Sequence, residues 1–184
     1  MVKEYVYCPR IAYFKMFSVY EPPTESMQYS KNLTLKYNEI VEIVNQNLGS
    51  GYSVFVEVFV KSKKIGVVGK VDAVAINSLE AVPIEVKLNT SPEKLKKIAL
   101  HHLAQCIAYC IAVEETFKKQ VNRFLLVSLE PRAVYEIKVG VALREFIYRI
   151  SKEIDKMIAE EKMPTQTPSK RKCAACFYRK ICIR

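Results

Sequence analysis

Three short runs of β-branched and aromatic residues constrain the fold more than any other feature of the sequence. They cover residues 52–60, 65–76 and 81–88, and the turn Asn77-Ser78 separates the last two. Strand-forming runs joined by short turns pair with their neighbours, so the three runs predict an antiparallel meander. The rest of the chain must then pack against a β-sheet.

Helical spacing of apolar residues and two further strand-like runs surround the meander. The remaining predicted elements are a short helix from Pro9, a helix over 25–48, a helix from Pro92 to about Thr116, strands over 121–129 and 133–139, and a helix over about 141–162. This order predicts an α/β fold with a central mixed β-sheet flanked by helices.

The charge balance indicates the kind of partner. The chain has 29 Lys and Arg residues against 19 Asp and Glu residues, a formal net charge of +10. Such a balance favours a polyanion such as nucleic acid, or an anionic membrane surface. No apolar run is long enough to cross a membrane, and the N-terminal sequence lacks the pattern of a signal peptide, so we expect a cytoplasmic protein without a membrane partner.

Two acids and a lysine fall within the apolar strands of the meander. Asp72 lies in the second strand, and Glu85 and Lys87 lie two positions apart in the third. Because side chains alternate along a strand, Glu85 and Lys87 share one face, and strand pairing brings Asp72 beside them. Paired carboxylates repel each other unless a cation binds, and hard oxygen ligands suit Mg²⁺ or Mn²⁺. The alternative is that Glu85 and Lys87 form an exposed polar edge.

A polar stripe on the following helix accompanies this group. Gln105 and Tyr109 are four residues apart and therefore lie on one helix face, which His101 extends. We expect this stripe to hydrogen-bond the lysine, a carboxylate or a bound backbone. A plain polar helix edge is the alternative interpretation.

The cysteines predict a second, softer metal site. Cys173, Cys176 and Cys182 lie in the basic tail, and Cys8 is the candidate fourth ligand because the ends of a domain often lie close together. In a reducing compartment such thiols indicate metal binding before disulfides. The spacing fits zinc and an iron–sulfur cluster equally well.

Two other cysteines have a different setting. Cys106 and Cys110 follow His102 at helical spacing among apolar residues. A metal-binding stripe is one interpretation, and burial of small apolar side chains in the core is the favoured one.

In order and spacing, the polar motifs resemble the RecB-like branch of the PD-(D/E)xK nuclease superfamily. The matching segments are Gly69 to Asp72, Glu85 to Lys87, and Gln105 to Tyr109. The resemblance implies that Asp72 and Glu85 hold the metal, helped by the Val86 carbonyl, with Lys87 as the catalytic lysine. It also places Gln105 and Tyr109 in the active site.

Adding the cysteines, the sequence resembles the CRISPR-associated exonuclease Cas4 family over nearly its whole length. The resemblance implies a [4Fe–4S] or [2Fe–2S] cluster, held by Cys8, Cys173, Cys176 and Cys182, and exonuclease action on single-stranded DNA. It also implies spacer acquisition together with the CRISPR integrase proteins Cas1 and Cas2. We expect residues 1–184 to form a single nuclease domain, with a core over 25–162 and a cluster module made of 1–20 and 163–184.

One position departs from that family pattern. The family usually places a metal-binding histidine in the helix before the first strand, and Asn38 takes its place here. Asparagine is a neutral and weaker ligand, for which Glu39 or Glu57 would have to compensate. The departure supports an alternative function as a DNA-binding scaffold with weak or no catalysis. A zinc-stapled nucleic-acid binder is the third alternative.

Overall fold

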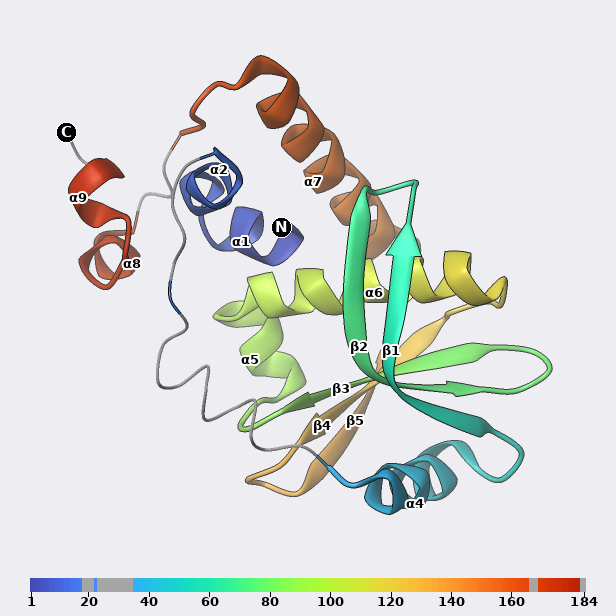
Figure 1. The fold of residues 1–184 in the computed structure, drawn as a ribbon. Coiled ribbons are helices and arrows are strands. Elements are labelled where there is room, and N and C mark those ends of the chain that lie inside the picture. The colour runs from blue at the N-terminus through green and yellow to red at the C-terminus, as the bar shows by residue number, and fades with distance from the viewer. Residues whose placement is uncertain (18–21, 23–34, 166–168, 183–184) are drawn as a thin grey trace.

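The computed structural model describes residues 1–17, 22, 35–165 and 169–182, which form a five-stranded sheet with helices on both faces (Figure 1). In chain order the elements are α1 (Val2–Tyr7), α2 (Pro9–Phe17), α4 (Tyr37–Leu48), β1 (Ser53–Ser62), β2 (Val67–Ile76), β3 (Ala81–Lys87), α5 (Pro92–Lys97), α6 (Leu100–Phe117), β4 (Arg123–Ser128), β5 (Ala133–Lys138), α7 (Val141–Glu160), α8 (Lys170–Ala174) and α9 (Arg179–Cys182). The α/β class predicted from the sequence is confirmed.

The sheet keeps the strands in sequence order, β1-β2-β3-β4-β5. The first three strands pair antiparallel, which confirms the meander, and β4 and β5 form a second antiparallel pair. Between them β3 and β4 are parallel, because α5 and α6 carry the chain back across one face. The sheet is therefore mixed, and the C-terminal end of β3 lies at the switch between its two halves.

Two apolar clusters fix the helices on the sheet. The larger cluster joins one face to α6, α7 and the N-terminal helices through residues such as Val71, Phe124 and Ile147. The smaller cluster joins the other face to α4 through Ile40 and Val44, which are 4% and 0% exposed. Each cluster removes a continuous apolar surface from water, which supplies most of the driving force for folding.

The structure differs from the predicted helices in two places. The single helix from Pro92 to about Thr116 is two helices, α5 and α6, which meet at Ile98 and Ala99. Both backbone amides there donate to the Lys94 carbonyl, which closes α5 and lets α6 start in a new direction. The prediction also missed α1, a six-residue helix before Cys8.

Other boundaries agree with the sequence more closely. The predicted helix over 25–48 is present from Tyr37, and its first part, residues 25–34, lies outside the described residues. Within the part of the chain that the structure describes, no helix is both long and apolar enough to cross a membrane.

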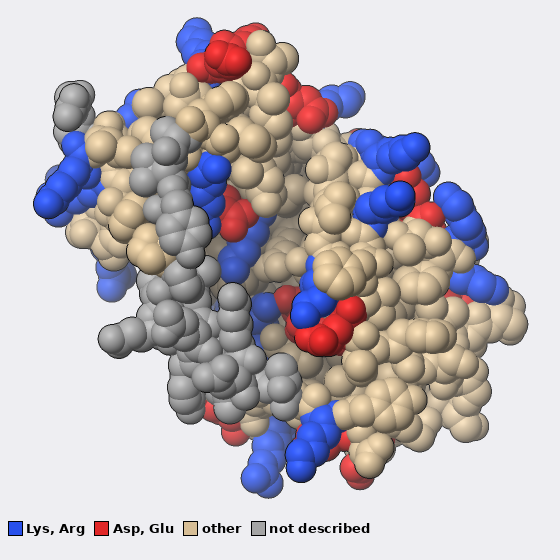
Figure 2. Space-filling view, in the orientation of Figure 1, with Lys and Arg blue, Asp and Glu red and all other residues tan. Residues whose placement is uncertain are grey.

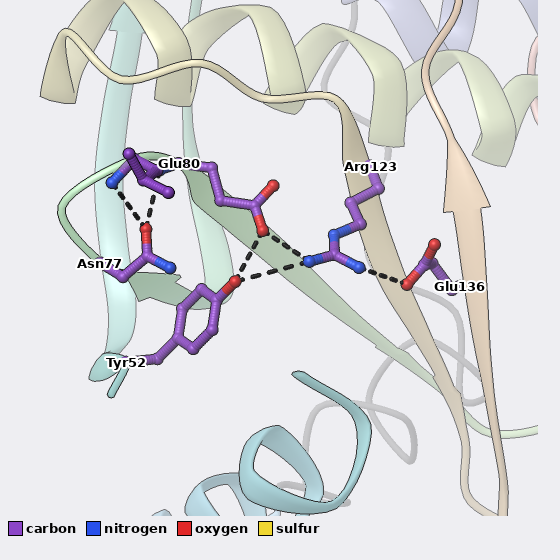
Figure 3. A network of polar contacts seen from close by, with 6 residues as sticks. Tyr52, Asn77, Glu80, Arg123 and Glu136 are labelled. Atoms are coloured by element: carbon purple, nitrogen blue, oxygen red, sulfur yellow. Dashed lines mark hydrogen bonds and ion pairs between the residues drawn. The ribbon is translucent and has the colours of Figure 1, made fainter. Parts of the chain in front are cut away.

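A polar network fastens the end of the sheet where β3 begins (Figure 3). The Arg123 guanidinium donates to the carboxylates of Glu80 and Glu136, and the Tyr52 hydroxyl donates to Glu80 at 2.6 Å. Burial alone would raise the pKa of Glu80, but the hydrogen bonds from Arg123 and Tyr52 outweigh burial and lower it. The network links residues before β1 and β3 to strands β4 and β5.

The lowered pKa of Glu80 makes part of the stability depend on pH. We expect Glu80→Gln to lower the free energy of unfolding at neutral pH by about 1–2 kcal/mol, because a charge-assisted hydrogen bond is lost. Since the folded-state pKa lies below the ordinary value of 4.5, this difference from wild type is present above pH 4.5 and shrinks as the pH falls through the folded-state pKa. Urea unfolding at several pH values measures it.

Glu136→Gln is the matched control, since Glu136 binds the same arginine but is more exposed, at 37% of its side chain. A smaller loss is expected there because solvent screens the pair. An equal difference between Glu80→Gln and wild type at all pH values would contradict the assignment.

Candidate active site and cysteine pocket

Strand β3 presents its two charged residues to α6. Ile84 and Val86 belong to the apolar cluster beneath α4, so the alternating Glu85 and Lys87 face the other side of the sheet. Glu85 is 5% exposed, and the Lys87 ammonium binds its Oε1. The alternative of an exposed polar edge is excluded for Glu85.

Asp72 reaches the same place from β2. The backbone pairing of β2 with β3 ends at Ala73 and Ile84, and the Asp72 side chain continues it by accepting a hydrogen bond of 2.7 Å from the Val86 amide. Across the hairpin, Glu57 has a left-handed φ of 51° and binds Lys70. The structure thus brings Asp72, Glu85 and Lys87 together at the end of the β2–β3 ladder.

Burial dominates the electrostatics of this group. Burial raises the pKa of the Glu85 carboxyl, and the nearby Asp72 carboxylate raises it further, although Lys87 acts in the opposite direction. Burial would lower the pKa of Lys87, but the attraction of Glu85 outweighs it and the pKa is raised. Ionised Glu85 therefore needs a nearby cation.

The polar stripe on α6 lies near these charges, since Glu85, Lys87 and Asp72 all affect the pKa of Tyr109, but among the described residues its hydrogen bond is internal rather than to the lysine or a carboxylate. Gln105 donates to the Tyr109 hydroxyl at 3.1 Å, while the buried Gln105 Oε1 has no hydrogen-bond partner among the described residues. The Tyr109 ring lies directly over Gly69, where a Cβ atom would come within 2.6 Å of the ring. This contact gives a physical reason for the glycine in the Gly69 to Asp72 motif.

The sequence prediction missed one charged neighbour, Lys3 on α1. Lys3 lines a pocket together with Gln105 and Tyr109. It is close enough to Lys87 and Glu85 for both to shift its pKa. Lys3 and Tyr7 lie four residues apart and so share one face of α1. That relation could be predicted only if α1 was recognised as a helix, which the sequence prediction did not do.

Two adjacent histidines lie between this group and the cysteines. The ring of Tyr7 packs edge-on against His101 at 5.0 Å between centroids, and the ring of His101 lies 4.3 Å from that of His102. Burial, helped by the charge of Lys3, lowers the pKa of His101 to about 4 and that of His102 to about 3. Both rings are neutral at physiological pH.

Cys8 and the three tail cysteines, from opposite ends of the sequence, line one pocket. Cys8 follows α1, Cys173 and Cys176 lie in and after α8, and Cys182 ends α9. Figure 1 shows α8 and α9 next to α2. The structure therefore brings Cys8 to the tail cysteines, as the sequence analysis predicts.

Side chains from the N-terminal helices hold the tail in place. Arg10 donates from Nη1 to the Cys182 carbonyl at 2.9 Å and lies 3.5 Å from its sulfur. Tyr178 is 1% exposed and stacks on Phe14 at 5.2 Å. The Lys172 ammonium lies 4.4 Å from the centre of the Tyr7 ring.

The two remaining cysteines lie in the core, and the departing position lies on the surface. Cys106 and Cys110 are 3% and 0% exposed in the larger apolar cluster, which confirms the core interpretation. Asn38 is exposed and lines a surface pocket made of α4 residues only. Glu39 accepts a hydrogen bond from the Lys36 amide and so caps α4, and Glu57 pairs with Lys70.

The donor atoms are of the chemical type that each of the two expected metal centres requires. Asp72 and Glu85 offer carboxylate oxygens, and the cysteine pocket offers four sulfurs. As the described side chains stand, no three of the His, Cys, Asp and Glu residues are grouped so that they could hold a metal ion. Acidic and basic side chains gather in a hollow on the face shown in Figure 2.

Comparison with known proteins agrees with this geometry. Residues 19–183 match the family described as the PD-(D/E)XK nuclease superfamily. A CRISPR-associated exonuclease Cas4 of Aeropyrum pernix is 33% identical, over 99% of this chain and 92% of that protein. One of Thermoproteus tenax is 29% identical, over 99% and 90%. The crystal structure of SSO0001 has a similar fold, with a TM-score of 0.50, 20% identity, and coverage of 99% of this chain and 84% of that one.

The contact between Gly69 and Tyr109 can be tested by adding one methyl group. We expect Gly69→Ala to lower the free energy of unfolding by about 1–3 kcal/mol, because the ring must move to relieve the overlap. Urea unfolding followed by circular dichroism measures the change. Gly140→Ala is the matched control, since no atom lies within 4 Å of its added Cβ. Equal stability of the two variants would contradict the proposed contact.

Proposed function

Because the chain belongs to the CRISPR-associated exonuclease Cas4 family, within the PD-(D/E)XK nuclease superfamily, we propose that it is a metal-dependent exonuclease acting on single-stranded DNA. Its nuclease centre is formed by Asp72, Glu85 and Lys87. The observation that carries the proposal is the burial of the Glu85 carboxylate beside an aspartate and a lysine at the end of a strand.

The carboxylates supply the ligands for Mg²⁺ or Mn²⁺. Asp72 accepts a hydrogen bond from the Val86 amide with Oδ2. Its other carboxylate oxygen, Oδ1, is the one that would bind the cation. Glu85 supplies another carboxylate oxygen from β3. When bound, such a metal polarises a phosphoryl oxygen and lowers the pKa of a water molecule.

The neighbouring side chains orient the reacting groups. Lys87, held at Glu85, places a positive charge where negative charge grows on the cleaved phosphate. Gln105 keeps the Tyr109 hydroxyl in place through its amide, at 3.1 Å. Because Asn38 stands where the family usually has a metal-binding histidine, Asp72 and Glu85 form the main metal site in this proposal. A cleavage assay tests whether these two carboxylates suffice.

The cysteine pocket is proposed to hold an iron–sulfur cluster. Four thiols from both ends of the chain line it, and the burial of Tyr178 against Phe14 shields one side. A cluster of this kind takes four cysteine ligands, and its binding energy adds to the stability of the fold. In this proposal residues 1–20 and 163–184 form the cluster module of one nuclease domain, and 25–162 form the core.

The proposed partners follow from the family and the charge. The net charge of +10 favours DNA, and the relatives carry a CRISPR-associated name. We therefore place the activity in the acquisition of CRISPR spacers, with Cas1 and Cas2 as assembly partners. Pull-down of each integrase protein by the purified chain tests that assignment directly.

Removal of any member of the charged group should abolish cleavage. We expect Asp72→Asn, Glu85→Gln and Lys87→Met each to reduce Mn²⁺-dependent degradation of labelled single-stranded DNA by at least about a hundredfold. Each substitution nearly preserves size, so thermal unfolding should still show a folded protein. Glu153→Gln and Lys138→Met, at exposed positions on α7 and β5, are the matched controls and should cleave normally.

The same assay separates the enzyme from the scaffold. A wild-type protein that binds single-stranded DNA but leaves it intact with Mg²⁺ and with Mn²⁺ would support the catalytically inactive alternative. Normal cleavage by one of the three active-site variants would remove that residue from the catalytic set.

Metal analysis tests the cysteine pocket. We expect anaerobically purified protein to be coloured and to contain iron, and Cys173→Ala to lose the colour, most of the iron and several kcal/mol of stability, about the scale of a lost metal site. Cys110→Ala, a core cysteine, should keep its iron. A colourless protein that contains zinc would establish the zinc-stapled alternative.

A further inference from the structure

Lys3 occupies an unusual position for a lysine. It lies on α1, is half-buried, and lines a pocket whose other walls include Val67 and Val68 of the β1–β2 hairpin and Gln105 and Tyr109 of α6. The pocket therefore adjoins the carboxylate group, since Gln105 and Tyr109 belong to both. Burial lowers the pKa of Lys3, and the charge of Lys87 lowers it further.

The acids near Lys3 are engaged with other cations. Glu4 binds the Met1 amino group at 3.0 Å and Lys15 at 3.7 Å, and Glu85 binds Lys87. Over residues 1–17, 22, 35–165 and 169–182, Lys3 itself forms no ion pair. A half-buried ammonium group without a counter-ion is unfavourable, so the site is suited to an anion.

The rest of the pocket limits what that anion can be. Glu4 also lines the pocket but pairs with the Met1 amino group and Lys15, and the buried acceptor Gln105 Oε1 offers nothing to an anion, so the pocket recognises an anion through the Lys3 ammonium. The exposed Val68 side chain, at 79%, leaves the pocket open to solvent rather than enclosed. An open site beside the cleavage centre fits one unit of a longer polyanion better than a small enclosed metabolite.

We infer that Lys3 binds a backbone phosphate of the DNA strand, next to the phosphate that is cleaved, and so positions the strand across Asp72 and Glu85. This inference rests on the proposed nuclease function and adds a substrate-binding residue to it. Lys3 and Lys87 then offset the repulsion between the carboxylates and the approaching phosphates on two sides.

A packing role is the alternative explanation. The aliphatic part of Lys3 could cover apolar surface between α1 and α6 while its ammonium group stays in water. In that case Lys3→Met would preserve the contacts, and neither the affinity for DNA nor its salt dependence would change.

Binding and cleavage are measured separately, on full-length cluster-containing protein. Binding uses fluorescein-labelled oligothymidine in the Asp72→Asn background, where the strand is not degraded. Lys3→Met should raise Kd about tenfold, as expected for loss of a charge-assisted hydrogen bond. It should also reduce the slope of log Kd against log salt by about 0.7, the value for one phosphate contact on a single strand.

Cleavage uses the otherwise wild-type chain. Lys3→Met should raise KM about tenfold and change kcat by less than about twofold, because the contact is made before and during the reaction. Lys3→Arg should restore both Kd and KM, and Lys138→Met, which removes an equal charge from β5, should behave like wild type. Lys3→Gln is a second neutral variant if Lys3→Met is unstable.

The two arms distinguish the possible failures. Unchanged Kd, salt slope and KM in both neutral Lys3 variants would overturn the role of Lys3 even if the wild-type protein cleaves DNA well. An inactive wild-type protein would overturn the nuclease proposal, while the binding arm would still decide whether Lys3 contacts a phosphate. A similar loss in Lys138→Met would show only a general effect of net charge and would also overturn the inference.

Discussion

The burial of the Glu85 carboxylate is the constraint on which the arrangement of the site depends. A carboxylate that is 5% exposed is unfavourable unless cations compensate it. Lys87 provides one such charge from two positions along the same strand, and a divalent ion would provide another. The strands on either side have little freedom, because Asp72 binds the Val86 amide and the parallel pairing with β4 continues to Lys87. The site is therefore as rigid as the sheet that carries it.

Helix α1 connects the two parts of the molecule that the sequence presents as separate. Lys3 lies near its first turn, beside the carboxylates, and Cys8 follows its last residue, in the cysteine pocket. The helix has only six residues and gains its order from packing on α6 and from contacts such as the Tyr7 ring against His101. A cluster bound by the four cysteines, as proposed above, would also restrain the helix that carries Lys3.

Local patterns in the sequence determine much of this structure. Alternation placed Glu85 and Lys87 on one face, and short turns predicted the pairing that brings Asp72 to them, because both depend only on neighbouring residues. Lys3 could not be found in this way, since its place depends on how α1 packs on α6. The break at Ile98 was missed for a related reason: helix propensity continues through it, and the change of direction is set by the apolar face of α6.

The distribution of charge explains why the proposed nuclease centre needs more than its carboxylates. Asp72 and Glu85 repel a phosphodiester as well as each other, so a substrate can approach only where positive charge outweighs them. Lys87 forms an ion pair with Glu85, and Lys70 forms one with Glu57 at the edge of the hairpin. Of the lysines close to the carboxylates in the described chain, Lys3 has no ion-pair partner, and it lines the pocket where we infer that the DNA strand binds. A net charge of +10 favours DNA over the surface in general, whereas in the proposed function a half-buried lysine beside the carboxylates would help to set where along the backbone the cut falls.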